Sequence, residues 1–229
     1  QFYTEAIPIT SSVEIRARAY EPNRIPSSVV SRLYQAVDSD LSHFSSNLPI
    51  VLMDTGGNKI PGTDSSSYVR AQSLFLDTDG SGQATAAGPA DFAGPVGMRI
   101  RGRSSTQFPK KQYKMETWDD KGQDRDVELL GLPSESDWVL HGPYSDKTLM
   151  RNYLAYRWWG RMGHYSVRTR FCELFLNDDK DPRMSCADDY VGVYLLVESI
   201  KIAKNRVDLA QLTPHDDHEP GITGGYIIE

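Results

Sequence analysis

Apolar and polar residues alternate along several stretches of the chain, which is the pattern of half-buried strands. Near the N-terminus, residues 13–19 place apolar side chains at odd positions and charged ones at even positions. Residues 190–198 are apolar on both faces, so this strand is predicted to be central in its sheet. Strands are predicted over residues 13–19, 28–34, 48–54, 98–103, 112–118, 171–176 and 190–198, and from residue 224 onward.

One segment has helical periodicity instead. Ser145 or Asp146 provides an N-cap, and an apolar residue recurs at every fourth position from Met150 to Met162. This stripe predicts a helix whose apolar face packs on the core. Gly163 follows as a C-cap.

Strands outnumber helices, so the predicted fold class is α+β, a mixed or antiparallel sheet with a few packed helices and an N-terminal β segment. Residues 1–36 are predicted to be a partial β-sandwich-like module or a β extension. Residues 37–47 are polar and predict a linker, and residues 48–229 form the main domain. Residues 56–67 and 77–95 are rich in Gly, Ser, Asp and Pro and predict long loops.

Composition narrows the class of protein. The chain has 229 residues, of which 39% are hydrophobic and 24% charged, as in a globular protein. Its formal net charge of −6 argues against nucleic acid or an anionic lipid surface as the main partner. No apolar run approaches the roughly 20 residues that span a bilayer.

The two cysteines leave two alternatives open. Cys172 lies in a predicted strand and Cys186 in the polar loop that follows it. A disulfide between them would close the loop and imply an extracellular or periplasmic location. The alternative is one buried and one exposed thiol.

The strongest candidate chemistry is a basic hairpin. Residues 99–114 contain six Lys or Arg and no acid, in a chain that is acidic overall. Guanidinium forks and lysine ammonium groups bind phosphate oxygens, and a hydroxyl-rich turn adds donors. The candidate phosphate ligands are Arg101, Arg103, Ser104, Lys110 and Lys111. The alternative is a solvated basic strand face.

Other candidates have plainer alternatives. Asp146, Arg151 and Asn152 lie in the first turns of the predicted helix, where capping and surface ion pairs would also explain them. Glu198 ends an apolar strand, and a buried carboxylate there would need a cationic partner. Residues 77–82 fail the spacing of a calcium loop, and residues 215–219 are metal-friendly but polar, so no metal ligand is assigned.

These segments together resemble a known family. The runs Gly-Met-Arg-Ile-Arg-Gly-Arg-Ser-Ser at 97–105 and Phe-Pro-Lys-Lys-Gln-Tyr-Lys at 108–114 are similar to the signature of the spore coat protein CotH kinase-like family. Further matches fall at residues 130–133, 137–140, 146–148, 151–152, 176–177, 192–198 and 224–226, so the resemblance extends from about residue 48 to the end. Residues 7–27 resemble the end of the β-sandwich modules found at the C-termini of chitobiases.

The resemblance implies an atypical bacterial protein kinase domain, secreted or at the cell surface. It implies binding of Mg²⁺ and ATP and phosphorylation of Ser or Thr on a secreted or surface protein. Lys110 and Lys111 would contact the ATP phosphates with support from Arg101, and Glu198 could orient one of the lysines. Asp146, Arg151 and Asn152 would hold the architecture of the site.

One departure from the family supports a second hypothesis. The family continues past its Gly-Gly-Tyr strand to the acidic residues that act with Mg²⁺, whereas this sequence ends at Glu229. We therefore expect either poor catalysis or a longer natural chain. The alternative function is a non-catalytic extracellular structural or adhesion module, such as a filament subunit, that associates with itself through its terminal strands.

Overall fold

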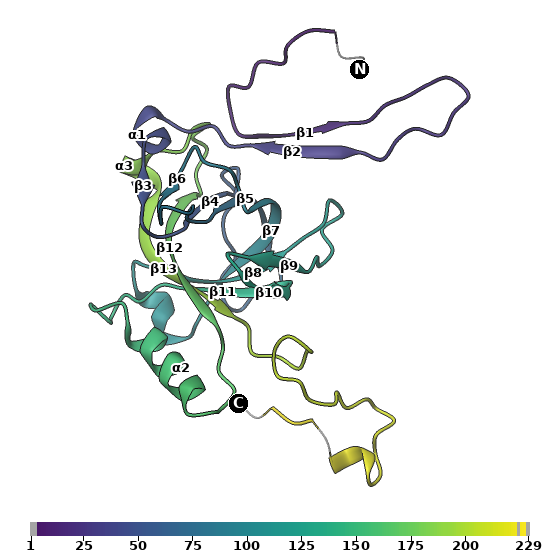
Figure 1. The fold of residues 1–229 in the computed structure, drawn as a ribbon, viewed down its shortest axis with the longest axis vertical. Coiled ribbons are helices and arrows are strands. Elements are labelled where there is room, and N and C mark those ends of the chain that lie inside the picture. The colour runs from purple at the N-terminus through teal and green to yellow at the C-terminus, as the bar shows by residue number, and fades with distance from the viewer. Residues whose placement is uncertain (1–3, 224, 228–229) are drawn as a thin grey trace.

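The computed structural model describes residues 4–223 and 225–227, and it is mostly β with few helices (Figure 1). The strands are β1 (Val13–Ala17), β2 (Val30–Tyr34), β3 (Ser45–Ser46), β4 (Ile50–Asp54), β5 (Val69–Leu76), β6 (Ala84–Thr85), β7 (Phe92–Arg101), β8 (Gln112–Thr117), β9 (Val127–Leu129), β10 (Leu132–Glu135), β11 (Asp137–His141), β12 (Thr169–Asn177) and β13 (Tyr190–Glu198). The helices are α1 (Ser39–Ser42), α2 (Arg151–Arg161) and α3 (Cys186–Asp189), with 3₁₀ turns η1 (Ser104–Gln107) and η2 (Gly221–Thr223). None of the helices in this part of the chain is long and apolar enough to cross a membrane.

Seven strands close into a barrel in the order β11-β13-β12-β4-β5-β7-β8, with β8 pairing back onto β11. Every pair is antiparallel except β4 with β12, which run parallel from Ile50 beside Glu173 to Asp54 beside Asn177. A mixed or antiparallel sheet was predicted, but its closure into a barrel was not. Closure removes the free edges that an open sheet would expose.

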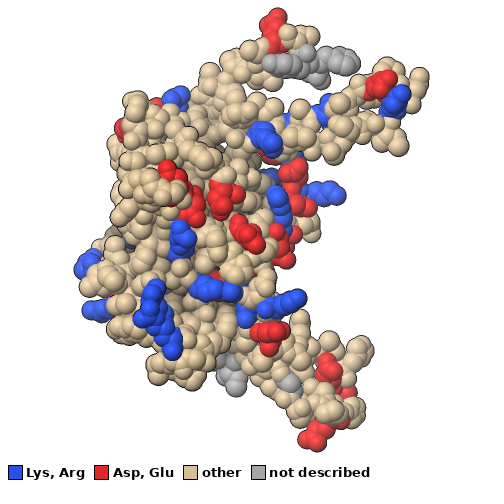
Figure 2. All heavy atoms as spheres, viewed as in Figure 1, with Lys and Arg blue, Asp and Glu red and all other residues tan. Residues whose placement is uncertain are grey.

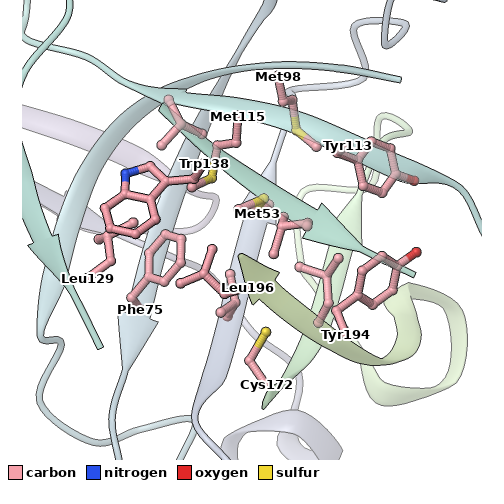
Figure 3. Close-up of a cluster of buried hydrophobic side chains, with 14 of the residues drawn as sticks. Met53, Phe75, Met98, Tyr113, Met115, Leu129, Trp138, Cys172, Tyr194 and Leu196 are labelled. Atoms are coloured by element: carbon pink, nitrogen blue, oxygen red, sulfur yellow. The ribbon is translucent and has the colours of Figure 1, made fainter. Parts of the chain in front are cut away.

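The barrel interior is filled with apolar side chains (Figure 3). Met98 from β7 and Met115 from β8 point inward, as the alternation of their strands predicts. The side chains labelled in the close-up are Met53, Phe75, Met98, Tyr113, Met115, Leu129, Trp138, Cys172, Tyr194 and Leu196. The inner face of each strand therefore belongs to one core.

A second apolar cluster lies on the outer face of β4 and β12. It includes Ile50 and Leu52 from β4 and Phe175 from β12, and it is covered by Leu41 from α1. Residues 37–47, which were predicted to be a linker, thus hold α1 and β3 and bury Leu41 completely. Apolar residues on both faces of β4 follow from its place between the two clusters.

The predicted disulfide is wrong. Cys172 and Cys186 are both free thiols. The Cys172 side chain belongs to the interior of the barrel, whereas Cys186 packs against the outer cluster. The wall of the barrel therefore separates the two side chains. The structure has two free thiols in place of the predicted disulfide.

The predicted core-facing stripe on the helix is also wrong. The helix begins at Arg151, later than predicted, and no residue of α2 is buried. Tyr153 and Tyr156 pack on the outer face of the barrel, while Trp158 and Trp159 are 58% and 50% exposed. From residue 147 to 172 the sequence has six Lys or Arg and no acid, and Figure 2 shows blue side chains over this part of the surface. Met162 is the C-cap of the helix, and Gly163, the predicted C-cap, follows it with φ of +88°.

The N-terminal residues form a hairpin of β1 and β2 that projects from the barrel (Figure 1). An ion pair of 3.3 Å between Arg16 and Asp120 connects it to the turn after β8. Among the described residues this segment forms a two-stranded hairpin and no β-sandwich, so the resemblance to the chitobiase module has no support in the structure. The last predicted strand includes residues 224, 228 and 229, which lie outside the described residues, and residues 225–227 form no strand.

Candidate functional site

The basic hairpin lies at one rim of the barrel, where β7 ends and β8 begins. Arg101 pairs with Gln112 across these strands. On the other side of β8, Tyr113 pairs with Leu140, which places His141 next to Gln112. Residues in one row across a sheet share a face, so Arg101, Gln112 and His141 lie on one side. Their inward-facing neighbours belong to the core, and this row therefore faces outward.

The arginines of the rim carry charge that no acid among the described residues neutralises through an ion pair. Arg101 is the last residue of β7, and Arg103 precedes η1, which contains Ser104. Both arginines are exposed, and neither forms an ion pair within residues 4–223 and 225–227. Gly102 between them has φ of +105°, a conformation that turns the chain sharply after β7 and suits glycine.

Lys110 reaches across the rim to β13. Its Nζ donates to the carbonyl oxygen of Val193 at 2.6 Å and lies 4.7 Å from the centre of the Tyr194 ring. Burial lowers the pKa of the Lys110 ammonium, and the nearby carboxylate of Glu173 only partly offsets this. Gly192 leaves room for it, because a Cβ there would lie 3.2 Å from the Lys110 Nζ. The amine is thus partly desolvated but has further donors to offer.

Lys111 secures the turn that follows Arg103. Its Nζ donates to the carbonyl oxygens of Thr106 and Phe108, both at 2.8 Å. Its own carbonyl oxygen accepts from the Tyr194 hydroxyl at 2.8 Å. We call Lys110 and Lys111 the lysine strap. Gly142 allows its close packing, because a Cβ on Gly142 would lie 2.7 Å from the Lys111 carbonyl oxygen.

His141 joins this site, although the sequence analysis did not identify it. Its Nδ1 lies 3.0 Å from Gln112 Oε1. Burial and the positive charges of Arg101 and Lys110 lower the pKa of the imidazole, and Asp146 acts in the opposite direction. Arg101, Gln112 and His141 lie together only because β7, β8 and β11 are aligned side by side. The one local signal for this site in the sequence is a histidine at the end of an apolar strand.

Asp146 organises the loop between β11 and α2. Its carboxylate accepts from the backbone N–H of Arg151 at 2.8 Å and from the Thr148 hydroxyl at 2.7 Å. The Arg151 N–H bond, more than the other interactions, holds the pKa of this carboxyl below its usual value. Asn152 lies half-buried in the first turn of α2. Arg151 Nε also pairs with Asp146 Oδ1 at 3.5 Å, and Asp146 is close enough to His141 to affect its pKa, so Asp146 borders the rim.

Glu198 lies at the opposite end of β13 from the strap. It is buried, accepts from Arg168 Nε at 2.8 Å and from Arg206 Nη1 at 2.9 Å, and pairs with Trp138 across the sheet. Lys110 contacts Val193, five residues earlier, which at about 3.3 Å per residue is roughly 16 Å away along the strand. The structure therefore does not bring Glu198 together with the strap, and two arginines serve as its partners.

No metal site accompanies the rim in the described part of the chain. It holds no group of three or more His, Cys, Asp or Glu side chains that could bind a metal ion. In the loop at residues 77–82, Asp79 accepts from the backbone N–H groups of Ser81 and Gln83, as in an ordinary turn. The turn, and not the calcium loop, is the geometry observed there.

A comparison with models of known protein families shows to which family the chain belongs. The family model described as CotH kinase protein matches residues 98–219, more than half of the chain. The chain belongs to the CotH kinase protein family. No curated protein matches it.

The matched stretch contains the whole CotH candidate site. It begins within β7 and includes the rim, the strap, α2 and Glu198. The match is narrower than the predicted range of residues 48–229, since β4 and β5 lie outside it. Those two strands still complete the barrel that supports the rim.

Proposed function

We propose that this chain is a kinase-like domain that binds the phosphates of ATP at the barrel rim and takes part in phosphoryl transfer to Ser or Thr of a secreted or surface protein. The observation that carries the proposal is the gathering of Arg101, Arg103 and the lysine strap, none of which forms an ion pair inside the described ranges. Membership of the CotH kinase protein family supports the kinase-like class.

The donors at the rim fit a polyphosphate. A guanidinium group binds two phosphate oxygens through its fork, and an ammonium group has three hydrogens to donate. The Lys110 Nζ uses one on the Val193 carbonyl, and the Lys111 Nζ uses two on Thr106 and Phe108. Both lysines therefore keep a donor and a positive charge for a ligand. Ser104, at the start of η1, adds a hydroxyl.

The described residues do not supply a matching set of metal ligands, so we assign none to Mg²⁺ and derive no catalytic step from it. Asp146 and Glu198 are proposed to position the site. Asp146 fixes the loop that borders the rim, and Glu198 fixes the far end of β13 through Arg168 and Arg206.

The extracellular location is part of the proposal and depends on the family resemblance. A disulfide would have been an independent argument for an oxidising compartment. Because Cys172 and Cys186 are free thiols, that argument does not apply.

Calorimetric titration of the chain with ATP and Mg²⁺ tests the proposal. We expect binding by the parent chain and at least a tenfold loss in Arg101→Gln and Lys110→Met. Lys121→Gln is the matched control, because it removes one positive charge from an exposed turn beyond β8. The proposal fails if the parent does not bind ATP, which would favour the structural or adhesion module. It also fails if the control loses as much affinity as the rim variants.

A further inference from the structure

His141 stands beside the phosphate-binding cations without a role in the proposal so far. It is the last residue of β11, and its ring shares the outward-facing row with Arg101 and Gln112. It is half-buried, and the charges of Arg101, Lys110 and Asp146 all act on its ring. A titratable ring in this place will sense any charge that enters the rim.

The hydrogen bond to Gln112 defines the state of the ring. An amide oxygen accepts but cannot donate, so the hydrogen of the 3.0 Å contact lies on His141 Nδ1. In the neutral ring, Nε2 then carries a lone pair. Nε2 makes no hydrogen bond to the described residues, and it is not among their buried unpartnered atoms. It is therefore available to a ligand.

Burial and the charges around the ring together favour its neutral form when the rim holds no anion. Arg101 on β7 and Lys110 before β8 are cationic, Asp146 after β11 is anionic, and Leu195 opposite on β13 is apolar. Burial and the two cations together lower the pKa of His141, against the effect of Asp146. A phosphate bound by Arg101 and Lys110 would reverse this balance, because it brings negative charge close to the ring.

We propose that His141 is a phosphate ligand that takes up a proton when phosphate binds, so that occupancy of the rim depends on pH. The proton comes from solvent and is bound at Nε2, which then donates to a phosphate oxygen. The ring is uncharged when the site is empty. Once protonated, it adds a third cation to Arg101 and Lys110. This inference rests on the proposed function, because it concerns the same phosphate site.

Linkage gives the inference a measurable size. A ligand whose binding is coupled to one proton loses affinity as pH rises, by at most about tenfold per pH unit. We expect this dependence between the pKa of the free ring and the higher pKa of the phosphate-bound ring. His141→Gln keeps an amide that can pair with Gln112 but cannot take up a proton, so it should bind phosphate without that component.

The test is calorimetric titration of the whole chain with inorganic pyrophosphate and with ATP and Mg²⁺, in buffers of different ionisation enthalpy. The parent should take up more protons per ligand than His141→Gln, and this difference cancels protons that the ligand itself exchanges. His215→Gln, in an exposed loop, is the matched control and should behave like the parent. The ring signal of His141, followed by nuclear magnetic resonance, should titrate at higher pH with pyrophosphate than without it.

The outcomes separate the two claims. If the parent binds and only His141→Gln loses the proton uptake, the inference is supported. If the parent binds with the same proton uptake as His141→Gln, or the His141 titration does not move, the inference is overturned while phosphate binding stands. If the parent binds neither ligand, the proposed function fails and takes the inference with it.

Discussion

Glu198 and Arg206 form a buried ion pair whose loss can be predicted in some detail. The side chains of both residues are 0% exposed, and Arg206 Nη1 donates to Glu198 Oε1 at 2.9 Å. The Arg206 guanidinium lies 5.0 Å from the Trp138 ring, and its Nε and Nη2 have no hydrogen-bond partner among the described residues. Among the described residues Glu198 is the one carboxylate that forms an ion pair with Arg206.

Glu198→Gln should therefore destabilise the fold strongly. Removing one partner of a buried pair leaves an uncompensated charge, which costs about 3–5 kcal/mol. For a chain of this size each kcal/mol lowers the melting temperature by about 2–4 °C, which gives a fall of about 6–20 °C. Arg206→Met should cost less, about 1–3 kcal/mol, because Glu198 keeps Arg168 Nε and the Arg168 backbone N–H, both at 2.8 Å.

Urea unfolding of the parent, both single variants and the double variant Glu198→Gln/Arg206→Met measures these free energies. The double variant removes both charges and should be clearly more stable than the sum of the single losses predicts. A loss below about 1 kcal/mol in Glu198→Gln would refute the buried-charge argument. Strict additivity in the double variant would refute the coupling between the two residues.

Three further predictions test other parts of the structure. Gly142→Ala should lower the free energy of unfolding by about 1–3 kcal/mol and weaken ATP binding, because its Cβ would collide with the lysine strap. An unchanged melting temperature and an unchanged ATP affinity would contradict this. In a thiol titration Cys186 should react first and Cys172 only on unfolding, because burial raises the pKa of the Cys172 thiol to about 12. If both thiols react equally fast, Cys172 does not lie in the barrel interior. Burial disfavours ionisation of Asp137, but its contacts with Lys201 outweigh burial and hold the carboxyl pKa below its ordinary value of 3.8. Lys201→Gln should therefore be less stable than the parent above about pH 4, and this difference should shrink as the pH falls further and Asp137 takes up a proton; a difference that does not change with pH in urea unfolding would disprove this linkage.

The sequence predicts best the strands whose pattern is local. Alternation places Met98 inward and Arg101 outward on β7, and β13, which is apolar on both faces, lies between β11 and β12 as a central strand should. It misses β5, where polar residues such as Gln72 and Ser73 interrupt the pattern, and the short strands β9 to β11. Those strands are held by their barrel partners more than by their own composition.

The candidate site shows the same division. The basic residues of the rim form a run of Lys and Arg that is visible in the sequence. His141 and the partners of Glu198 depend on which strands lie side by side, and no local pattern contains that information. The stripe on α2 was misassigned because periodicity identifies an apolar face but not its neighbour.

The parallel pairing of β4 with β12 has a consequence for how the chain reaches its native state. Strands near residues 50 and 173 must meet before the barrel closes, so its contacts are of long range and its folding should be slow. During synthesis, β4, β5, β7 and β8 can pair early, but both outer strands stay open until β11 to β13 emerge. A fragment limited to the matched residues 98–219 would lack β4, β5 and most of β7, which leaves the edge of β12 and the edge of β8 open permanently and favours aggregation. A unit that folds independently must therefore begin before residue 50.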